Sequence, residues 1–162
     1  MKTCPHCGCD TAVPKLGKPR SVPQHRRYFA LIRAALMHWP EGHRFQPAGE
    51  DHLRKWLQAK AGYRDVQTIE TEGMTPAQAV AAVAAVLSRA DVHHFVQAVG
   101  SKLYVITSKS IAFGELNHLA ACVLFDAVAE VIEIETGIRC DDMIKTTPRK
   151  LAREPVVSEV TL

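Results

Sequence analysis

The sequence lacks any run of about 20 consecutive apolar residues, the length that a membrane-spanning helix requires. Its first residues also lack the apolar stretch of a signal peptide, so we expect a cytoplasmic protein. A Walker-type phosphate loop, a dinucleotide fingerprint and a nucleophile elbow are absent as well. The sequence therefore gives no support to nucleotide hydrolysis or acyl transfer, and binding is favoured over catalysis.

The chain has 162 residues, of which 47% are hydrophobic and 23% are charged. This size and composition predict one compact domain with its own core. Three of its five cysteines are crowded into the first nine residues, and the others, Cys122 and Cys140, are isolated. Such spacing does not resemble the disulfide framework of a secreted protein, so reduced thiols or a metal site fit better.

No acidic residue occurs between Thr11 and Pro40, although the whole chain has a formal net charge of only +3. The same segment carries six cationic residues: Lys15, Lys18, Arg20, Arg26, Arg27 and Arg33. A local excess of positive charge favours an anionic partner, and phosphate is the first candidate. The alternative is an ordinary solvated helix face, which is what many charge runs are.

Residues 21–39 have the periodicity of an amphipathic helix. One predicted face is apolar and comprises Tyr28, Phe29, Leu31, Ile32, Ala35, Leu36 and Trp39. The opposite face comprises Arg26, Arg27, Ala30 and Arg33, so one side can pack while the other binds. His25 falls beside the apolar face, where a core or interface role and a phosphate-contacting role are both open.

The remaining pattern predicts an α+β fold in a single domain. We expect about four helices, a β-hairpin or small antiparallel sheet, and a long C-terminal helix. The predicted helices cover 21–39, 50–61, 75–89 and a last segment from 113 or 114 to 136, and the predicted strands cover 65–71, 93–99 and 102–107. We expect residues 1–20 to form a cysteine-rich basic arm, 21–138 the domain, and 139–162 a flexible basic tail.

The last predicted helix has a wide apolar arc that suits a core or a dimer interface. The arc comprises Leu116, Leu119, Ala120, Val123, Leu124, Ala127, Val128, Val131 and Ile134. Its polar edge carries Asp126, Glu130 and Glu133, which form either a solvated acidic face or, less simply, the carboxylates of a metal-dependent nuclease.

The cysteine cluster at the start of the chain reads Cys4-Pro5-His6-Cys7-Gly8-Cys9. Two cysteines separated by two residues have the spacing of a zinc knuckle. Cys9 or His6 could supply a third ligand, and a fourth must come from elsewhere, such as Cys140, a histidine or another subunit. The sequence thus predicts a structural zinc site, with free thiols as the alternative.

Aromatic residues could stack on unpaired bases beside the cationic helix. The candidates are Tyr28, Trp56, Tyr63 and Tyr104. Burial in the core is the common alternative for aromatic residues at helical spacing.

Two stretches of the sequence resemble the NinB-like, or Orf-type, recombination proteins of phages and prophages. They are Ser21-Val22-Pro23-Gln24-His25-Arg26-Arg27-Tyr28-Phe29-Ala30-Leu31 and Lys109-Ser110-Ile111-Ala112-Phe113. The nearer resemblance is to an uncharacterised prophage family with the same order of helix, hairpin, turn and long helix. It implies a dimeric α+β protein that binds DNA and helps to load a strand-exchange protein on single-stranded DNA. By position, Arg26, Arg27 and Lys109 would contact DNA, and no catalytic residue carries over.

The leading hypothesis is therefore a phage recombination or replication accessory that binds single-stranded DNA through its basic helix and arm. One alternative is a phage protein that docks on a host protein, such as a single-strand binding protein or a defence factor. The other is a metal-dependent nuclease.

Overall fold

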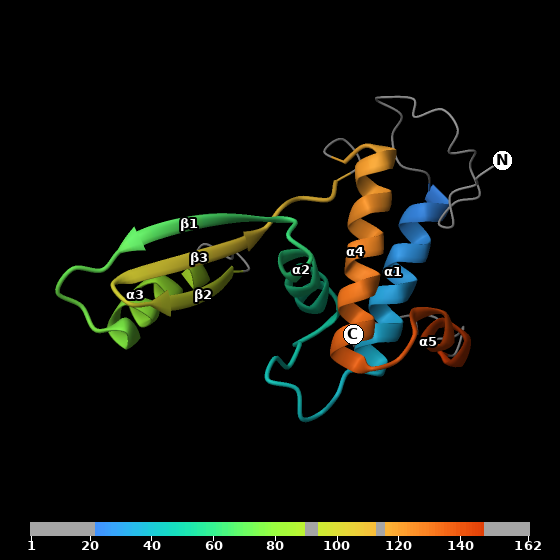
Figure 1. Ribbon diagram of the computed structural model, residues 1–162, viewed down its shortest axis with the longest axis horizontal. Helices are drawn as coiled ribbons and strands as arrows, with labels where there is room; N and C mark the ends of the chain where they lie inside the picture. The colour runs from blue at the N-terminus through green and yellow to red at the C-terminus, as the bar shows by residue number, and fades with distance from the viewer. Residues whose placement is uncertain (1–21, 90–93, 113–115, 148–162) are drawn as a thin grey trace, which may run out of the picture.

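The structure is a computed structural model that describes residues 22–89, 94–112 and 116–147. It confirms a single α+β domain (Figure 1). The elements in chain order are α1 (Val22–Met37), α2 (Glu50–Lys60), β1 (Arg64–Glu70), α3 (Pro76–Arg89), β2 (His94–Val99), β3 (Lys102–Ser108), α4 (His118–Thr136) and α5 (Cys140–Thr146). The helices and strands predicted up to residue 107 are all present, with shifts of a few residues at their ends.

The three strands form an antiparallel sheet in the order β1-β3-β2. Gly100, with φ 60°, and Ser101 join β2 to β3, which confirms the predicted hairpin. Helix α3 covers one face of the sheet, and this contact buries Ala79, Leu103 and Val105 in a small hydrophobic cluster. Strand β1 is exposed along its whole length.

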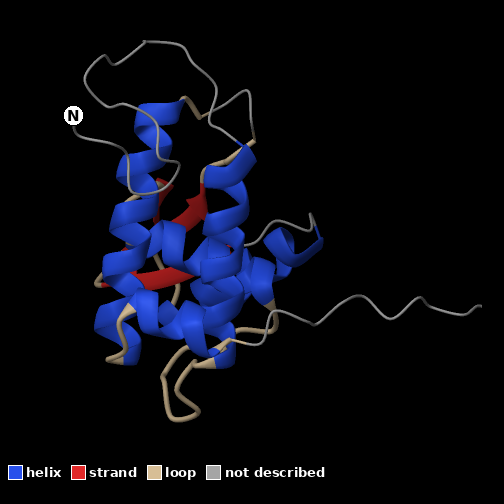
Figure 2. Cartoon of the chain, turned by 90° about the vertical axis from the view of Figure 1, so that its right-hand side faces the viewer, coloured by secondary structure: helices blue, strands red, loops and turns tan. Residues whose placement is uncertain are grey.

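Helices α1, α2, α4 and α5 form a separate body with the main hydrophobic core. Figure 1 shows α1 and α4 side by side, and Figure 2 shows that helices make up this end of the molecule. At the centre, the rings of Tyr28 and Phe125 stack with centroids 4.0 Å apart and an angle of 12° between their planes. Tyr28 and Trp56 are therefore core residues, not exposed platforms for bases.

The two faces predicted for the first helix are confirmed in α1. Arg26, Arg27, Ala30 and Arg33 are all exposed, whereas Tyr28, Leu31, Ile32 and Ala35 are buried. One polar residue, Gln24, is also completely buried on the packed side.

The prediction for the last helix was only partly right. Helix α4 begins at His118, because the side chain of Asn117 caps it by accepting a hydrogen bond from the Ala120 amide at 2.9 Å. The buried residues are Ala121, Leu124, Phe125, Val128 and Ile132, whereas Leu119, Val123 and Ile134 are 60–71% exposed. Leu119, Val123 and Ile134 thus lie outside the main core, and the dimer interface that this arc could form instead stays a prediction.

The prediction of a flexible tail from residue 139 was wrong for its first part. Residues Cys140–Thr146 form α5, which packs against α1 and buries Met143 completely. A helix of seven residues is too short to show a repeating apolar stripe in the sequence. The rest of the predicted tail, 148–162, and the predicted arm, 1–20, lie outside the described residues.

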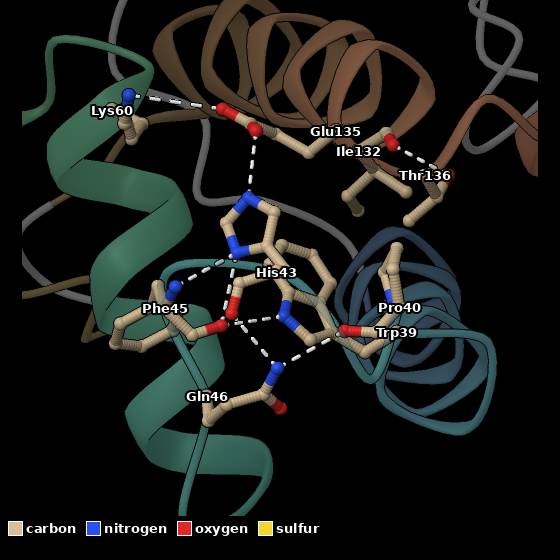
Figure 3. Close-up of polar contacts among 9 residues, drawn as sticks. All are labelled: Trp39, Pro40, His43, Phe45, Gln46, Lys60, Ile132, Glu135 and Thr136. Atoms are coloured by element: carbon tan, nitrogen blue, oxygen red, sulfur yellow. Dashed lines mark hydrogen bonds and ion pairs between the residues drawn. The ribbon is translucent and has the colours of Figure 1, made fainter.

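A polar cluster fixes the loop between α1 and α2 against α4 (Figure 3). The Phe45 amide donates to His43 Nδ1 at 3.0 Å, so the Nε2–H of His43 donates to Glu135 Oε2 at 2.8 Å. Lys60 Nζ lies 3.7 Å from the other oxygen of Glu135, and Trp39 Nε1 donates to the Phe45 carbonyl at 2.9 Å. The Trp39 indole, the His43 ring and the Glu135 carboxylate are thereby all paired, as buried polar groups require.

This cluster should make stability depend on pH. The hydrogen bond from His43 and the nearby cations Lys60 and Arg44 outweigh burial and lower the pKa of Glu135. A carboxylate with a lowered pKa stabilises the fold above its unfolded pKa of about 4.3, and this contribution disappears as the pH falls through the folded value.

We expect Glu135→Gln to lower the free energy of unfolding by on the order of 1 kcal/mol at pH 7, and by less in acid. Urea unfolding at a series of pH values measures both differences. Glu130→Gln, at an exposed position of the same helix, is the control and should show no such trend. If the loss of unfolding free energy changed with pH equally in the two variants, Glu135 would not be the source of the pH dependence.

Candidate functional site

An open cleft of about 680 Å³ lies where α1, α2 and the end of β3 meet. In Figure 1 the strands β1 and β3 join the helical body beside α2. The lining residues are His25 and Phe29 from α1, Asp51, Arg54 and Lys55 from α2, and Ser108, Lys109, Ser110, Ile111 and Ala112 from β3 and the turn after it. We call this feature the basic cleft, because three cations and one carboxylate line it.

The basic cleft joins the two sequence motifs that were identified separately. His25 and Phe29 belong to the motif of the first helix, and their rings lie 4.6 Å apart between centroids. Lys109 to Ala112 belong to the second motif, more than 70 residues later in the chain. The fold therefore brings both motifs to one surface feature.

Helix α2 supplies most of the charge in the cleft. Arg54 and Lys55 both form ion pairs with Asp51, and Lys55 Nζ lies 2.8 Å from Asp51 Oδ2. Burial alone would raise the pKa of Asp51, but the hydrogen bonds from Lys55 and Arg54 outweigh it and lower the pKa. Arg54 Nη1 also donates to Gln58 Oε1 at 3.0 Å, which fixes the guanidinium group. Two cations therefore surround one carboxylate and leave an excess of positive charge.

The opposite wall is fixed by the backbone of the turn after β3. The Lys109 amide donates to the Tyr63 carbonyl at 3.3 Å, and the Tyr63 hydroxyl donates to the Ser110 carbonyl at 3.0 Å. The Ser110 hydroxyl accepts from the Ala112 amide at 3.2 Å. Lys109 Nζ lies 3.5 Å from Asp65, and its side chain is 47% exposed. The lysine is thus held at the rim with its charge open to solvent.

The predicted cationic face of α1 is partly neutralised by neighbouring helices. Arg33 Nε donates to Glu50 of α2 at 2.8 Å, and Arg27 lies 3.7 Å from Asp141 of α5. Helical spacing puts Arg26 and Arg33 about a quarter turn from His25, on the cleft side, and Arg27 on the α5 side. Neither arginine lines the cleft itself, but both are exposed on the adjoining face of α1. Three other predicted DNA contacts, Lys15, Lys18 and Arg20, lie outside the described residues.

The sequence prediction missed Arg54 and Lys55 as site residues. The available signal was a second helix with these two cations on its polar side. Because the acids Glu50 and Asp51 stand in the same helix, the net charge of that segment conceals the cations.

The metal-site predictions fall mostly outside the described residues, because Cys4, His6, Cys7 and Cys9 all precede residue 22. Within 22–89, 94–112 and 116–147 there is no group of three or more His, Cys, Asp or Glu side chains that could hold a metal ion. Asp126 and Glu130 are exposed, and Glu133 accepts a hydrogen bond from the Cys140 amide at 2.9 Å. Glu133 therefore has a structural role at the start of α5.

Comparison with protein-family models, curated proteins and solved structures finds no match to this chain. None of the helices within the described ranges has the length and apolar character needed to cross a membrane.

Proposed function

We propose that this protein binds single-stranded DNA, with the phosphate backbone lying along the basic cleft and the adjoining face of α1. In this arrangement Lys55, Lys109 and Arg54 contact phosphates, and Arg26 extends the contact along the helix. The wider role in phage recombination or replication rests on the resemblance of the two motifs. The homodimer, the host single-strand binding protein and the cytoplasmic location likewise remain predictions.

The main support for this proposal is the position of the two motifs on one basic surface. The cleft carries three cations from two different elements, and its Ser108, Ser110 and His25 side chains offer further hydrogen-bonding groups. Phe29 adds an apolar surface next to His25. Cations, hydroxyls and an aromatic ring together suit a flexible polyanion with exposed bases.

Binding of labelled single-stranded and double-stranded oligonucleotides across a salt series tests the proposal. We expect tight binding to single strands that weakens linearly with the logarithm of salt concentration, because phosphate contacts release counterions. A protein that shows no binding even at low salt would exclude this function and would favour docking on a host protein. Cleavage of the oligonucleotide that a chelator abolishes would favour the nuclease.

The two adjacent arginines of α1 should differ in their effect on binding. Arg26→Ala removes an exposed charge on the cleft side, whereas Arg27→Ala removes a charge on the α5 side beside Asp141. We expect Arg26→Ala to weaken single-strand binding by about threefold to tenfold and to reduce the salt slope by about 0.7, as for one lost phosphate contact. Arg27→Ala is the matched control and should change the affinity and the salt slope much less. Fluorescence anisotropy gives both values, and equal losses would contradict the proposed path.

A further inference from the structure

Strand β1 forms an open edge of the sheet. Among the described residues the strand order is β1-β3-β2, so β1 pairs with β3 on one side only. All seven of its residues are exposed, including Val66 at 48% and Ile69 at 40%. Figure 1 shows the outer edge of β1 on the side away from β2. An open edge of this length is a template for a further strand.

This edge lacks the features that usually prevent an open strand from pairing. The register with β3 is continuous from Arg64 to Glu70, so β1 has no bulge. The strand contains no proline, glycine or lysine, and residues 66–69 are uncharged and mostly β-branched. Bulges, prolines and lysines are the common means of blocking an edge. The sequence of β1 therefore favours association with another strand.

The backbone of β1 presents alternate residues to this edge. At the two ends of the ladder, the Lys109 amide donates to the Tyr63 carbonyl at 3.3 Å and the Thr71 amide donates to the Ser101 carbonyl at 2.9 Å. In an antiparallel ladder, every second residue turns its N–H and C=O toward the same neighbour. The odd-numbered residues therefore bond to β3, and the even-numbered residues direct their backbone groups to the open edge.

A second copy of β1 fits this edge over its full length in one register. With a twofold axis at Gln67, Val66 lies opposite the partner's Thr68, and Arg64 lies opposite the partner's Glu70. Even-numbered residues then face even-numbered residues, so the outward N–H groups meet outward C=O groups. A shift by two residues in either direction shortens the overlap and separates the two charges.

The charges of β1 are complementary to those of a second copy in this register. Arg64 and Glu70 stand at opposite ends of the strand, so each end of the pairing holds a cation opposite an anion. Within one chain, Arg64 Nη1 donates to the Ala59 carbonyl at 3.1 Å, and Glu70 lies 3.5 Å from Lys102 Nζ. A guanidinium has five N–H donors and a carboxylate has two oxygens, so both groups can make a further contact.

We propose that two copies of this chain associate through β1 and join their three-stranded sheets into one. The twofold axis runs at right angles to the sheet, so both copies of α3 cover the same face. Strand pairing over seven residues buries less than a standard interface of about 1,600 Å², so we expect a reversible dimer. The association does not require DNA, and its test therefore uses the protein alone.

Sedimentation equilibrium of the full-length protein measures this association. We expect the wild type to change from monomer to dimer as its concentration rises. Thr68→Pro removes an N–H that points to the open edge and spares the bonds to β3, so it should raise the dissociation constant by about tenfold or more. Lys145→Glu reverses an exposed charge on α5 and is the control, which should dimerise like the wild type.

A charge exchange locates the contact on β1. Arg64→Glu and Glu70→Arg each place like charges opposite one another, so each variant alone should be monomeric where the wild type is dimeric. An equal mixture of the two variants should dimerise, because each glutamate then faces an arginine. The two positions lie at opposite ends of β1, so no contact within one chain can produce this rescue. Circular dichroism checks that the variants are folded.

Three results would overturn the proposal. One is a wild type that stays monomeric up to about 1 mM. Another is a dimer that Thr68→Pro and both charge variants leave unchanged. The third is a dimer that Val123→Asp abolishes while Thr68→Pro does not, because the contact would then lie on the exposed face of α4.

Discussion

Replacing Phe125 by alanine is expected to lower the free energy of unfolding by about 3–5 kcal/mol. Phe125 is 2% exposed and its ring stacks on Tyr28, which is equally buried. The substitution removes the stacked ring and leaves a cavity between α1 and α4, where the surrounding helices can collapse only in part. Since a domain of this size is stable by about 5–15 kcal/mol, this loss is a large fraction of the total.

Urea unfolding, followed by circular dichroism, measures this effect. Val123→Ala is the matched control, because Val123 lies two residues earlier on α4 and is 65% exposed. We expect it to change the free energy of unfolding by less than about 0.5 kcal/mol. A small loss for Phe125→Ala, or similar losses for the two variants, would mean that α4 does not pack through the face described here.

The double variant Lys55→Ala and Lys109→Ala should weaken binding to single-stranded DNA by about tenfold or more at low salt, a loss of about 1.4 kcal/mol. The two lysines come from opposite walls of the basic cleft. Among the described residues each forms an ion pair with one carboxylate, Asp51 or Asp65, which an anionic ligand could partly displace. Loss of two phosphate contacts should also reduce the salt slope by about 1.4.

The chain offers a closely matched control for that experiment. Lys102→Ala and Lys145→Ala remove the same total charge, and each also breaks an ion pair with one acid, Glu70 or Asp142. Lys102 lies at the far end of β3 and Lys145 lies on α5, so neither lines the cleft. If the control pair weakened binding as strongly as the cleft pair, net charge alone would explain the affinity and the cleft would not be the site.

The fold could be predicted from the sequence where periodicity and turn signals agree. The two faces of α1 and the hairpin at Gly100-Ser101 are of this kind, because burial and turn geometry constrain each residue locally. The exposure of Leu119, Val123 and Ile134 could not be predicted in this way. Which apolar residues of α4 are covered depends on how many neighbouring helices reach it, and a single sequence does not contain that information.

The candidate site was predictable only in fragments. The motif around His25 and the motif around Lys109 stood out separately, but nothing in the sequence indicated that they meet. Arg54 and Lys55 did not stand out, because the nearby Asp51 lowers the net charge of that segment of the sequence. In the structure both cations nevertheless line the cleft. In the same way, Gln24 looked like one polar residue in a cationic helix, although it is completely buried against His118 and Cys122.

The sheet and the helical body have separate hydrophobic clusters of very different size. Three residues are buried between α3 and the sheet, whereas the helical body holds the main core. A region with few buried apolar residues opens locally at a low free-energy cost. The backbone amides of β1 and β2 should therefore exchange with solvent far sooner than those of α4. Because Lys109 follows β3 directly, each opening of the sheet would also remove one wall of the cleft. A ligand in the cleft would then slow hydrogen exchange in strands that it does not touch.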